Sequence, residues 1–309
     1  MKETIYVVGH KSPDTDTISS VIAYSQYLKK KGIKAMAVHA GELNNETKYV
    51  LKYFQAPAPK LLASAKGKTV ILVDHNEKSQ SPDSIAEAKI IEVVDHHRIT
   101  FDYPEPINFH SEPVGSTSTI IAKKYISSKT KISRQLAGLM LAGILSDTVV
   151  FRSPTTTKDD IILAKKLAKV AKIKNLEKFG IEIKKQKATL KGLSATEIIR
   201  SDFKDFDFSG RKVEIGQIEV VDLKEAENRA AELIKKMEEI AASENYVLIL
   251  LMATDIINQG SLILFAGDKT YLEKAFNRKI DNHSFYLKDV LSRKKQIVPP
   301  LTEVFRKLS

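Results

Sequence analysis

Short apolar runs alternate with amphipathic segments through the first 190 residues of this 309-residue chain. Continuous apolar runs predict strands that are buried on both faces, at 4–8, 34–38, 69–74 and 89–95, with a weaker run at 107–109. Apolar positions at helical spacing predict helices over 17–31, 45–54, 115–128, 133–148, 158–173 and 175–188. This alternation predicts a parallel sheet that is covered by helices.

The pattern changes near residue 190, after a segment over 188–194 that contains glycine and small polar residues. Beyond it the apolar spacing predicts strands at 213–221, 246–253 and 261–266, and helices at 223–243 and near 270–277. We therefore expect an α/β protein. Its parts are a parallel-sheet domain over 1–188, a hinge linker over 189–194 and a smaller mixed-sheet α/β domain over 195–309.

Composition narrows the class of protein. Cysteine is absent, which excludes disulfides, thiolate metal sites and a cysteine nucleophile, and agrees with a cytoplasmic location. Since the apolar runs fall short of the roughly 18 residues that a membrane span needs, we expect no membrane partner. The formal net charge of +11 fits either a lysine-rich surface or an anionic substrate. Aromatic residues make up only 7% and the basic residues are scattered, so we do not expect nucleic acid as a partner.

Histidine and aspartate gather where three predicted strands and one predicted helix end. They are His10, Asp14 and Asp16 in GHKSPDTD, Asp74 in VDHNE, Asp95, His96 and His97 in VDHHR, and Asp147 after an apolar helix. The carboxyl ends of neighbouring parallel strands line one crevice, so these side chains are expected in one pocket. Several carboxylates cannot all stay ionised there without a compensating cation. Nitrogen and oxygen ligands without thiolate suit Mn²⁺, Co²⁺ or Zn²⁺ better than Ca²⁺.

Each of these motifs, taken alone, has a simpler interpretation. Two aspartates after a strand are typical of a turn and a helix N-cap, and a lone Asp-His-His is typical of a solvated loop. A short basic run such as SRKKQ at 292–296 is typical of a solvated surface. His39 and His75 have no partner in the pattern and are interpreted as structural residues. The recurrence of the chemistry at four element ends favours a metal site.

The chain resembles the DHH phosphoesterase superfamily and, within it, the family II (manganese-dependent) inorganic pyrophosphatases. The matching pieces span almost the whole chain: GHKSPDTD, VDHNE, VDHHR, EPVGSTSTI, the helix that ends in SDT, and SRKKQIVP. Asp-His-His alone marks the superfamily, whereas VDHNE together with SRKKQ is far more specific. The resemblance implies hydrolysis of inorganic pyrophosphate to two phosphates by a metal-bridged hydroxide. It also implies a DHHA2-like second domain and a homodimer formed through the first domain.

The resemblance further implies two ions of Mn²⁺ or Co²⁺ per chain, with additional Mg²⁺ arriving with the substrate. One ion would be held by His10, Asp14 and Asp74, and the other by Asp16, Asp74, His96 and Asp147, so that Asp74 bridges the two. Asp95 would orient a ligand histidine, His97 would face the substrate, and Asp14 would accept a proton from water. Lys204, Arg293 and Lys294 of the second domain would bind the phosphate groups.

The alternative is another DHH enzyme, such as an exonuclease, a nanoRNase or a polyphosphatase. Its metal-binding half would be the same, and the difference would lie in the second domain. Nucleic-acid-cleaving relatives commonly have a glycine-rich segment that ends in histidine, and the sequence has only isolated glycines in INQGSLILFAGD. The sequence therefore favours pyrophosphate as the substrate.

Overall fold

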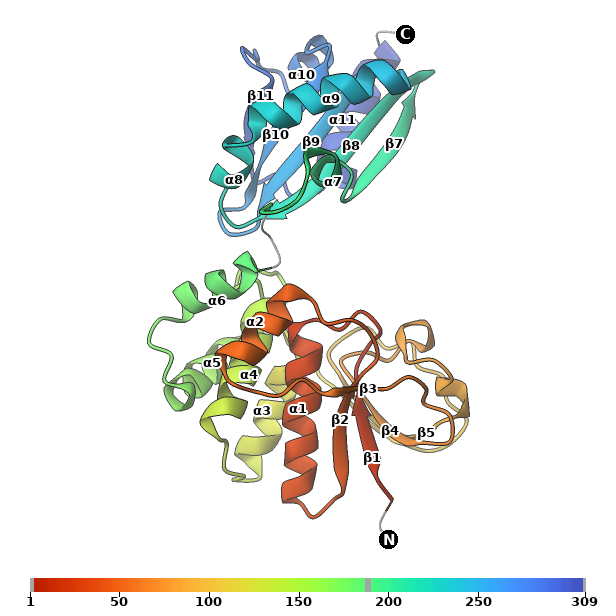
Figure 1. Cartoon of the computed structure of the whole chain (residues 1–309), viewed down its shortest axis with the longest axis vertical. Coiled ribbons are helices and arrows are strands. Elements are labelled where there is room, and N and C mark those ends of the chain that lie inside the picture. The colour runs from red at the N-terminus through yellow and green to blue at the C-terminus, as the bar shows by residue number, and fades with distance from the viewer. Residues whose placement is uncertain (1–2, 187–189, 308–309) are drawn as a thin grey trace. The chain divides into compact units, whose positions relative to one another are not determined.

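The computed structural model describes residues 3–186 and 190–307. The chain forms two compact units, Met1–Lys187 and Ala188–Ser309 (Figure 1). The hinge predicted over 189–194 begins at residue 189, which lies outside the described residues. Leu190 is buried in the core of the second unit, and its backbone N–H donates a hydrogen bond to Glu225 Oε2 at 2.9 Å.

The first unit is built on a parallel sheet with the strand order β3-β2-β1-β4-β5-β6. The strands are β1 (Ile5–Val8), β2 (Ala35–His39), β3 (Lys60–Leu61), β4 (Thr69–Val73), β5 (Lys89–Asp95) and β6 (Asn108–Ser111). Each neighbouring pair is parallel, which confirms the predicted sheet. β2 and β4 flank β1 on opposite sides, so the strand order reverses beside β1. Ligands bind at such a switch point in open α/β sheets.

Helices cover one face of this sheet. They are α1 (Thr15–Lys30), α2 (Asn45–Tyr53), α3 (Thr117–Ser127), α4 (Arg134–Asp147), α5 (Lys158–Ala171) and α6 (Leu176–Lys185). α1 packs on the sheet and contacts α3 and α4, and α4 is buried almost all round because its sequence is apolar almost throughout. The start of α1 is buried, and α4 ends at the buried Ser146 and the partly buried Asp147.

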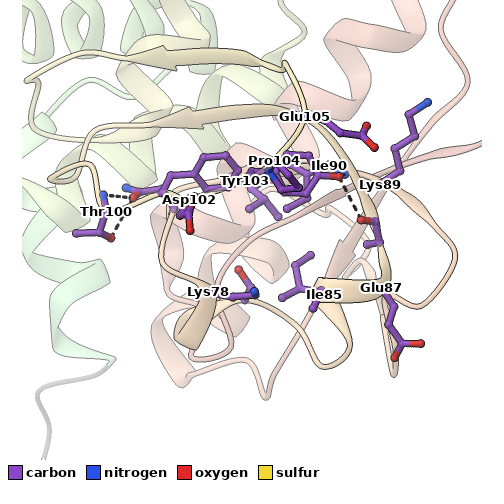
Figure 2. Close-up of a pocket in the computed structure, with 16 residues that line it drawn as sticks. Lys78, Ile85, Glu87, Lys89, Ile90, Thr100, Asp102, Tyr103, Pro104 and Glu105 are labelled. Atoms are coloured by element: carbon purple, nitrogen blue, oxygen red, sulfur yellow. Dashed lines mark hydrogen bonds between the residues drawn. The ribbon is translucent and has the colours of Figure 1, made fainter.

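The other face of the sheet is covered by an irregular segment that includes the 3₁₀ turns Lys78–Gln80 and Ile85–Glu87. Phe101 and Tyr103 from this segment pack against a buried cluster that includes the sheet residues Val70 and Leu72. A pocket of about 670 Å³ opens between the segment and the sheet (Figure 2). Tyr103 crosses it, and its hydroxyl accepts a hydrogen bond from the Ile90 backbone N–H at 3.0 Å.

The second unit is built on a mixed sheet with the strand order β11-β10-β9-β8-β7, as predicted for this half of the chain. The strands are β7 (Phe203–Phe208), β8 (Arg211–Val220), β9 (Leu248–Asp255), β10 (Gly260–Gly267) and β11 (Ser284–Lys288). β8 and β9 are parallel and the other pairs are antiparallel. The cores on the two faces include α7 (Ala195–Ile199) and α9 (Ala230–Glu244) in one, and α10 (Thr270–Ala275) and α11 (Val298–Lys307) in the other.

The prediction of a single helix over 223–243 is wrong, because the segment forms two helices, α8 (Lys224–Glu227) and α9. Arg229 lies at the break. Its guanidinium donates to the backbone carbonyls of Leu190 at 3.2 Å and Leu193 at 2.7 Å, a tertiary contact that periodicity does not reveal. Within the described ranges, no helix is both long enough and apolar enough to cross a membrane.

Candidate metal centre

Asp74 is the central residue of the site, directly after β4 at the switch point. It is 1% exposed, and each of its carboxylate oxygens faces a different histidine. Oδ2 lies 3.7 Å from His10 Nε2, and Oδ1 lies 3.5 Å from His96 Nε2. Two threonine hydroxyls also donate hydrogen bonds to Asp74, Thr17 to Oδ2 and Thr117 to Oδ1. The backbone of Asp74 has a φ of 65°, a left-handed conformation that is uncommon outside glycine and often found at functional sites.

Two groups of potential ligand atoms meet at Asp74. One consists of His10, Asp14 and Asp74, and the other of Asp16, Asp74, His96 and Asp147, with the atoms of each group within 4.8 Å of one another. These groups have the same members as the two ligand sets implied by the resemblance. A third, overlapping group contains Asp74, His96 and His97.

The two aspartates of GHKSPDTD are placed by helix ends. Asp14 is the N-cap of α1, and its Oδ1 accepts the Thr17 N–H at 2.9 Å. The same side chain is therefore both a helix cap and a member of the first ligand group. Asp16 is fully buried and accepts the backbone N–H groups of Thr117 at 2.7 Å and Ser118 at 3.0 Å in the first turn of α3. The positive end of a helix favours such a carboxylate.

His96 shows why a cation fits here. Its Nδ1 lies 2.9 Å from the Val114 carbonyl oxygen, which can only accept, so Nδ1 carries a proton. Nε2 is buried, and it lies 3.5 Å from both Asp74 Oδ1 and Asp147 Oδ2 without a hydrogen-bond partner among the described residues. A neutral His96 therefore aims a lone pair at two carboxylates, and either a proton or a metal ion must lie between them.

The pKa values of the clustered groups are shifted because several buried carboxylates lie close together. Burial raises the pKa of Asp16 to about 7, and the charge of Asp74 adds to the shift. Burial and the charges of Asp16, Asp14 and Asp74 raise the pKa of Asp147 well above its ordinary value. Burial alone would lower the pKa of His96, but its contact with Asp74 raises the pKa to about 9. Without a metal, protons therefore compensate the clustered charge.

Asp95 differs from its expected role. Its Oδ1 lies 2.9 Å from His97 Nδ1, whereas the second ring nitrogen of His96 is held by Val114. Asp95 therefore orients His97, which is about half exposed, and not a histidine of the two Asp74-centred ligand sets. Asn76, which follows His75 in VDHNE, donates to Asp95 Oδ2 at 2.6 Å and lines the pocket of Figure 2. No role was predicted for Asn76, because an amide after a strand resembles any turn residue.

His39 and His75 lie outside the ligand groups found among the described residues. His75 is buried, and its ring nitrogens contact the Val73 carbonyl oxygen at 3.1 Å and Ser81 Oγ at 3.0 Å. His39 Nδ1 lies 2.6 Å from the Gly41 carbonyl oxygen. Both rings thus have local backbone partners, which fits a structural role.

The three basic residues of the resemblance belong to the second unit. Lys204 on β7 is exposed and pairs with Ile215, while Lys294 is exposed in the π turn Arg293–Ile297. Arg293 is 7% exposed, and its Nη1 donates to the carbonyl oxygens of Asp202 at 2.6 Å and Ile215 at 3.0 Å. Its Nη2 donates to Asp202 Oδ1 at 2.9 Å. The Ile215 contact brings Arg293 next to the strand that carries Lys204.

Comparison with known proteins first defines the class. Residues 4–144 match the family model of the DHH family, N-terminal domain, and residues 181–304 match that of the DHHA2 domain. The first of these matches contains the whole parallel sheet and all the clustered aspartates and histidines except Asp147. The chain is thus a two-domain DHH protein.

Near-full-length relatives define the family. The chain is 47% identical over 308 residues to the manganese-dependent inorganic pyrophosphatase of Methanocaldococcus jannaschii, with 97% of this chain and 99% of the relative covered. It is 43% identical over 305 residues to that of Bacillus subtilis, with 97% and 98% covered. A crystal structure from Methanococcus jannaschii, provisionally described as a family II inorganic pyrophosphatase, has a TM-score of 0.65 at 46% identity and covers 98% of this chain and 99% of that one. The chain belongs to the family of manganese-dependent inorganic pyrophosphatases.

Proposed function

We propose that the protein hydrolyses inorganic pyrophosphate to two phosphates at a dinuclear metal centre. The observation that carries the dinuclear site is the position of Asp74, whose two oxygens each face one histidine and one set of carboxylates. The family supplies the substrate, since near-full-length relatives at 43–48% identity are named manganese-dependent inorganic pyrophosphatases.

The residues around Asp74 fit two cations of the Mn²⁺ or Co²⁺ type, because they offer imidazole nitrogen and carboxylate oxygen without thiolate. His10, Asp14 and Asp74 would hold one ion, and Asp16, Asp74, His96 and Asp147 the other. When bound, such ions lower the pKa of water and neutralise phosphoryl charge. Asp14 is the candidate proton acceptor, since its Oδ1 caps α1 while its side chain stays 37% exposed.

The second unit supplies charge for the substrate. Pyrophosphate carries three to four negative charges, and Lys204 and Lys294 offer exposed ammonium groups to its oxygens. Arg293 would contact a phosphate by exchanging part of its bond to Asp202, because that carboxylate already holds its Nη2. We further propose that closure at the hinge over 189–194 delivers these groups, that Mg²⁺ arrives with the substrate, and that the protein is a homodimer formed through its first unit.

The test is phosphate release from pyrophosphate, compared with oligonucleotide and polyphosphate, with Mn²⁺, Co²⁺ and Mg²⁺ in turn. The proposal expects pyrophosphate to be the best substrate and excess EDTA to abolish the reaction. Faster cleavage of oligonucleotide or polyphosphate would replace the proposed function by another activity of the DHH superfamily.

A further inference from the structure

Glu46, in the first turn of α2, is a buried carboxylate that lies beside the ligand groups but belongs to none of them. It is 1% exposed. Its Oε1 accepts a hydrogen bond from Thr15 Oγ1 at 2.7 Å and another from Ser146 Oγ. Its Oε2 lies 3.2 Å from Lys184 Nζ, which comes from α6. Three helices besides its own thus place a polar group on this one side chain or next to it.

The two hydroxyls that reach Glu46 belong to residues beside the candidate ligands. Thr15 stands between Asp14 and Asp16 at the start of α1, and Ser146 directly precedes Asp147 at the end of α4. A single oxygen atom of Glu46 therefore joins the two helix ends that carry three of the candidate ligand carboxylates. α1 and α4 pack against each other, but a bond between their ends fixes the spacing of these carboxylates more closely than apolar packing does.

Lys184 lies next to the other carboxylate oxygen of Glu46, Oε2. Both hydroxyls donate to Oε1 of Glu46, because a carboxylate oxygen has room to accept two hydrogen bonds. The ammonium group of Lys184 lies 3.2 Å from Oε2, so each oxygen of Glu46 faces a different set of polar groups. Lys184 Nζ also lies 3.4 Å from the Ser146 carbonyl oxygen and 3.5 Å from Ser146 Oγ, so it contacts the same helix end as Glu46.

We propose that Glu46 and Lys184 are positioning residues that set the spacing of Asp14, Asp16 and Asp147 for two metal ions. The inference rests on the dinuclear centre of the proposed function and adds residues that no ligand set contains. A buried ion pair by itself contributes little net stability, and an apolar pair of similar volume often gives a protein of equal or greater stability. The role therefore shows in metal affinity more than in folding.

The test measures Mn²⁺ binding by titration calorimetry on the full chain. Loss of a group that orients ligands typically weakens metal affinity 10- to 100-fold, so Glu46→Gln is expected to weaken both binding steps by about that factor. Ser146→Ala should weaken chiefly the step that involves Asp147. Glu42→Gln is the matched control, because the Glu42 side chain is 93% exposed and should leave both steps unchanged.

A second variant separates positioning from stability. Glu46→Leu with Lys184→Met replaces the charged pair by an apolar one, so the metal-free protein should keep its melting temperature within a few degrees while Mn²⁺ affinity falls. Wild-type affinity in this folded double variant would overturn the proposal, as would wild-type affinity in Glu46→Gln. Ser146→Ala keeps the ion pair, so unchanged affinity there would also count against it if the other variants do not fold.

The readout is separate from the proposed activity. If wild-type protein binds two Mn²⁺ but releases no phosphate from pyrophosphate, the proposed function fails while the effect of Glu46 on affinity can still be measured. If the wild type is active and Glu46→Gln binds Mn²⁺ normally, the proposed function survives and the positioning role falls.

Discussion

Removal of the metal ions should make the stability of the first unit depend on pH in a defined direction. Burial raises the pKa of Asp16 from 3.8 to about 7 in the metal-free protein. A raised folded-state pKa contributes stability that is fully present below the unfolded value and is lost as pH rises through the folded value. The window is therefore about pH 4 to 7, and Asp147 and Asp14, whose pKa values are also raised, act in the same direction.

The magnitude follows from the size of the shift. About three pKa units correspond to about 4 kcal/mol of folding free energy for Asp16 alone. In a unit of this length, 1 kcal/mol moves the melting temperature by about 2–4 °C, so the expected change is on the order of 10 °C. His96, with a pKa raised to about 9, continues the loss above neutral pH.

The assay is thermal unfolding in EDTA and in saturating Mn²⁺ at four values from pH 5 to pH 8. Groups elsewhere in the protein affect both curves equally, so the difference between the two melting temperatures isolates the site. We expect that difference to grow with pH, because metal ligands must be deprotonated and the metal-free protein loses stability. Asp16→Asn should flatten the EDTA curve. A difference that is constant or that shrinks toward pH 8 would refute this reasoning.

Three further substitutions have expected outcomes. Gly143→Ala would place a Cβ 2.6 Å from Asp16 Oδ1, so it should cost about 1–3 kcal/mol in denaturant unfolding and reduce Mn²⁺ affinity; unchanged affinity would contradict the tight fit. Asp95→Asn should lower the pKa of His97 in NMR titration, because the hydrogen bond to Asp95 is the largest cause of its raised value, and an unchanged pKa would contradict that. Arg293→Lys should reduce kcat/KM for pyrophosphate at least tenfold with Mn²⁺ content intact, since an ammonium cannot replace the planar fork. Full activity in that variant would exclude Arg293 from substrate binding.

Much of the fold was predictable because buried strands and amphipathic helices have distinct periods. The clustering of the strand-end residues was also predictable, since parallel strands end at one edge of a sheet. Glu46 and Lys184 were not, because each stands in a helix whose other charged residues face solvent, and burial of one charge depends on which helix packs against it. The partner of Asp95 could not be read either, since His96 and His97 are adjacent and only the backbone geometry decides which ring turns toward it.

Two features of the second unit, β7 and the contacts of Arg293, were not predicted for a similar reason. β7 has the sequence FKDFDF, which lacks a regular alternation, and most of its residues are exposed at the sheet edge. The contacts of Arg293 with Asp202 and Ile215 join segments far apart in the sequence, so a basic run at 293–295 gave no sign of a buried guanidinium.

The most direct test of the central claim is phosphate release from pyrophosphate during titration of metal-free protein with Mn²⁺. Two ions that share Asp74 predict activity that rises until two Mn²⁺ are bound per chain, and Asp74→Asn should abolish both binding and release. Full activity with one ion per chain, or with excess EDTA, would contradict a dinuclear centre at Asp74.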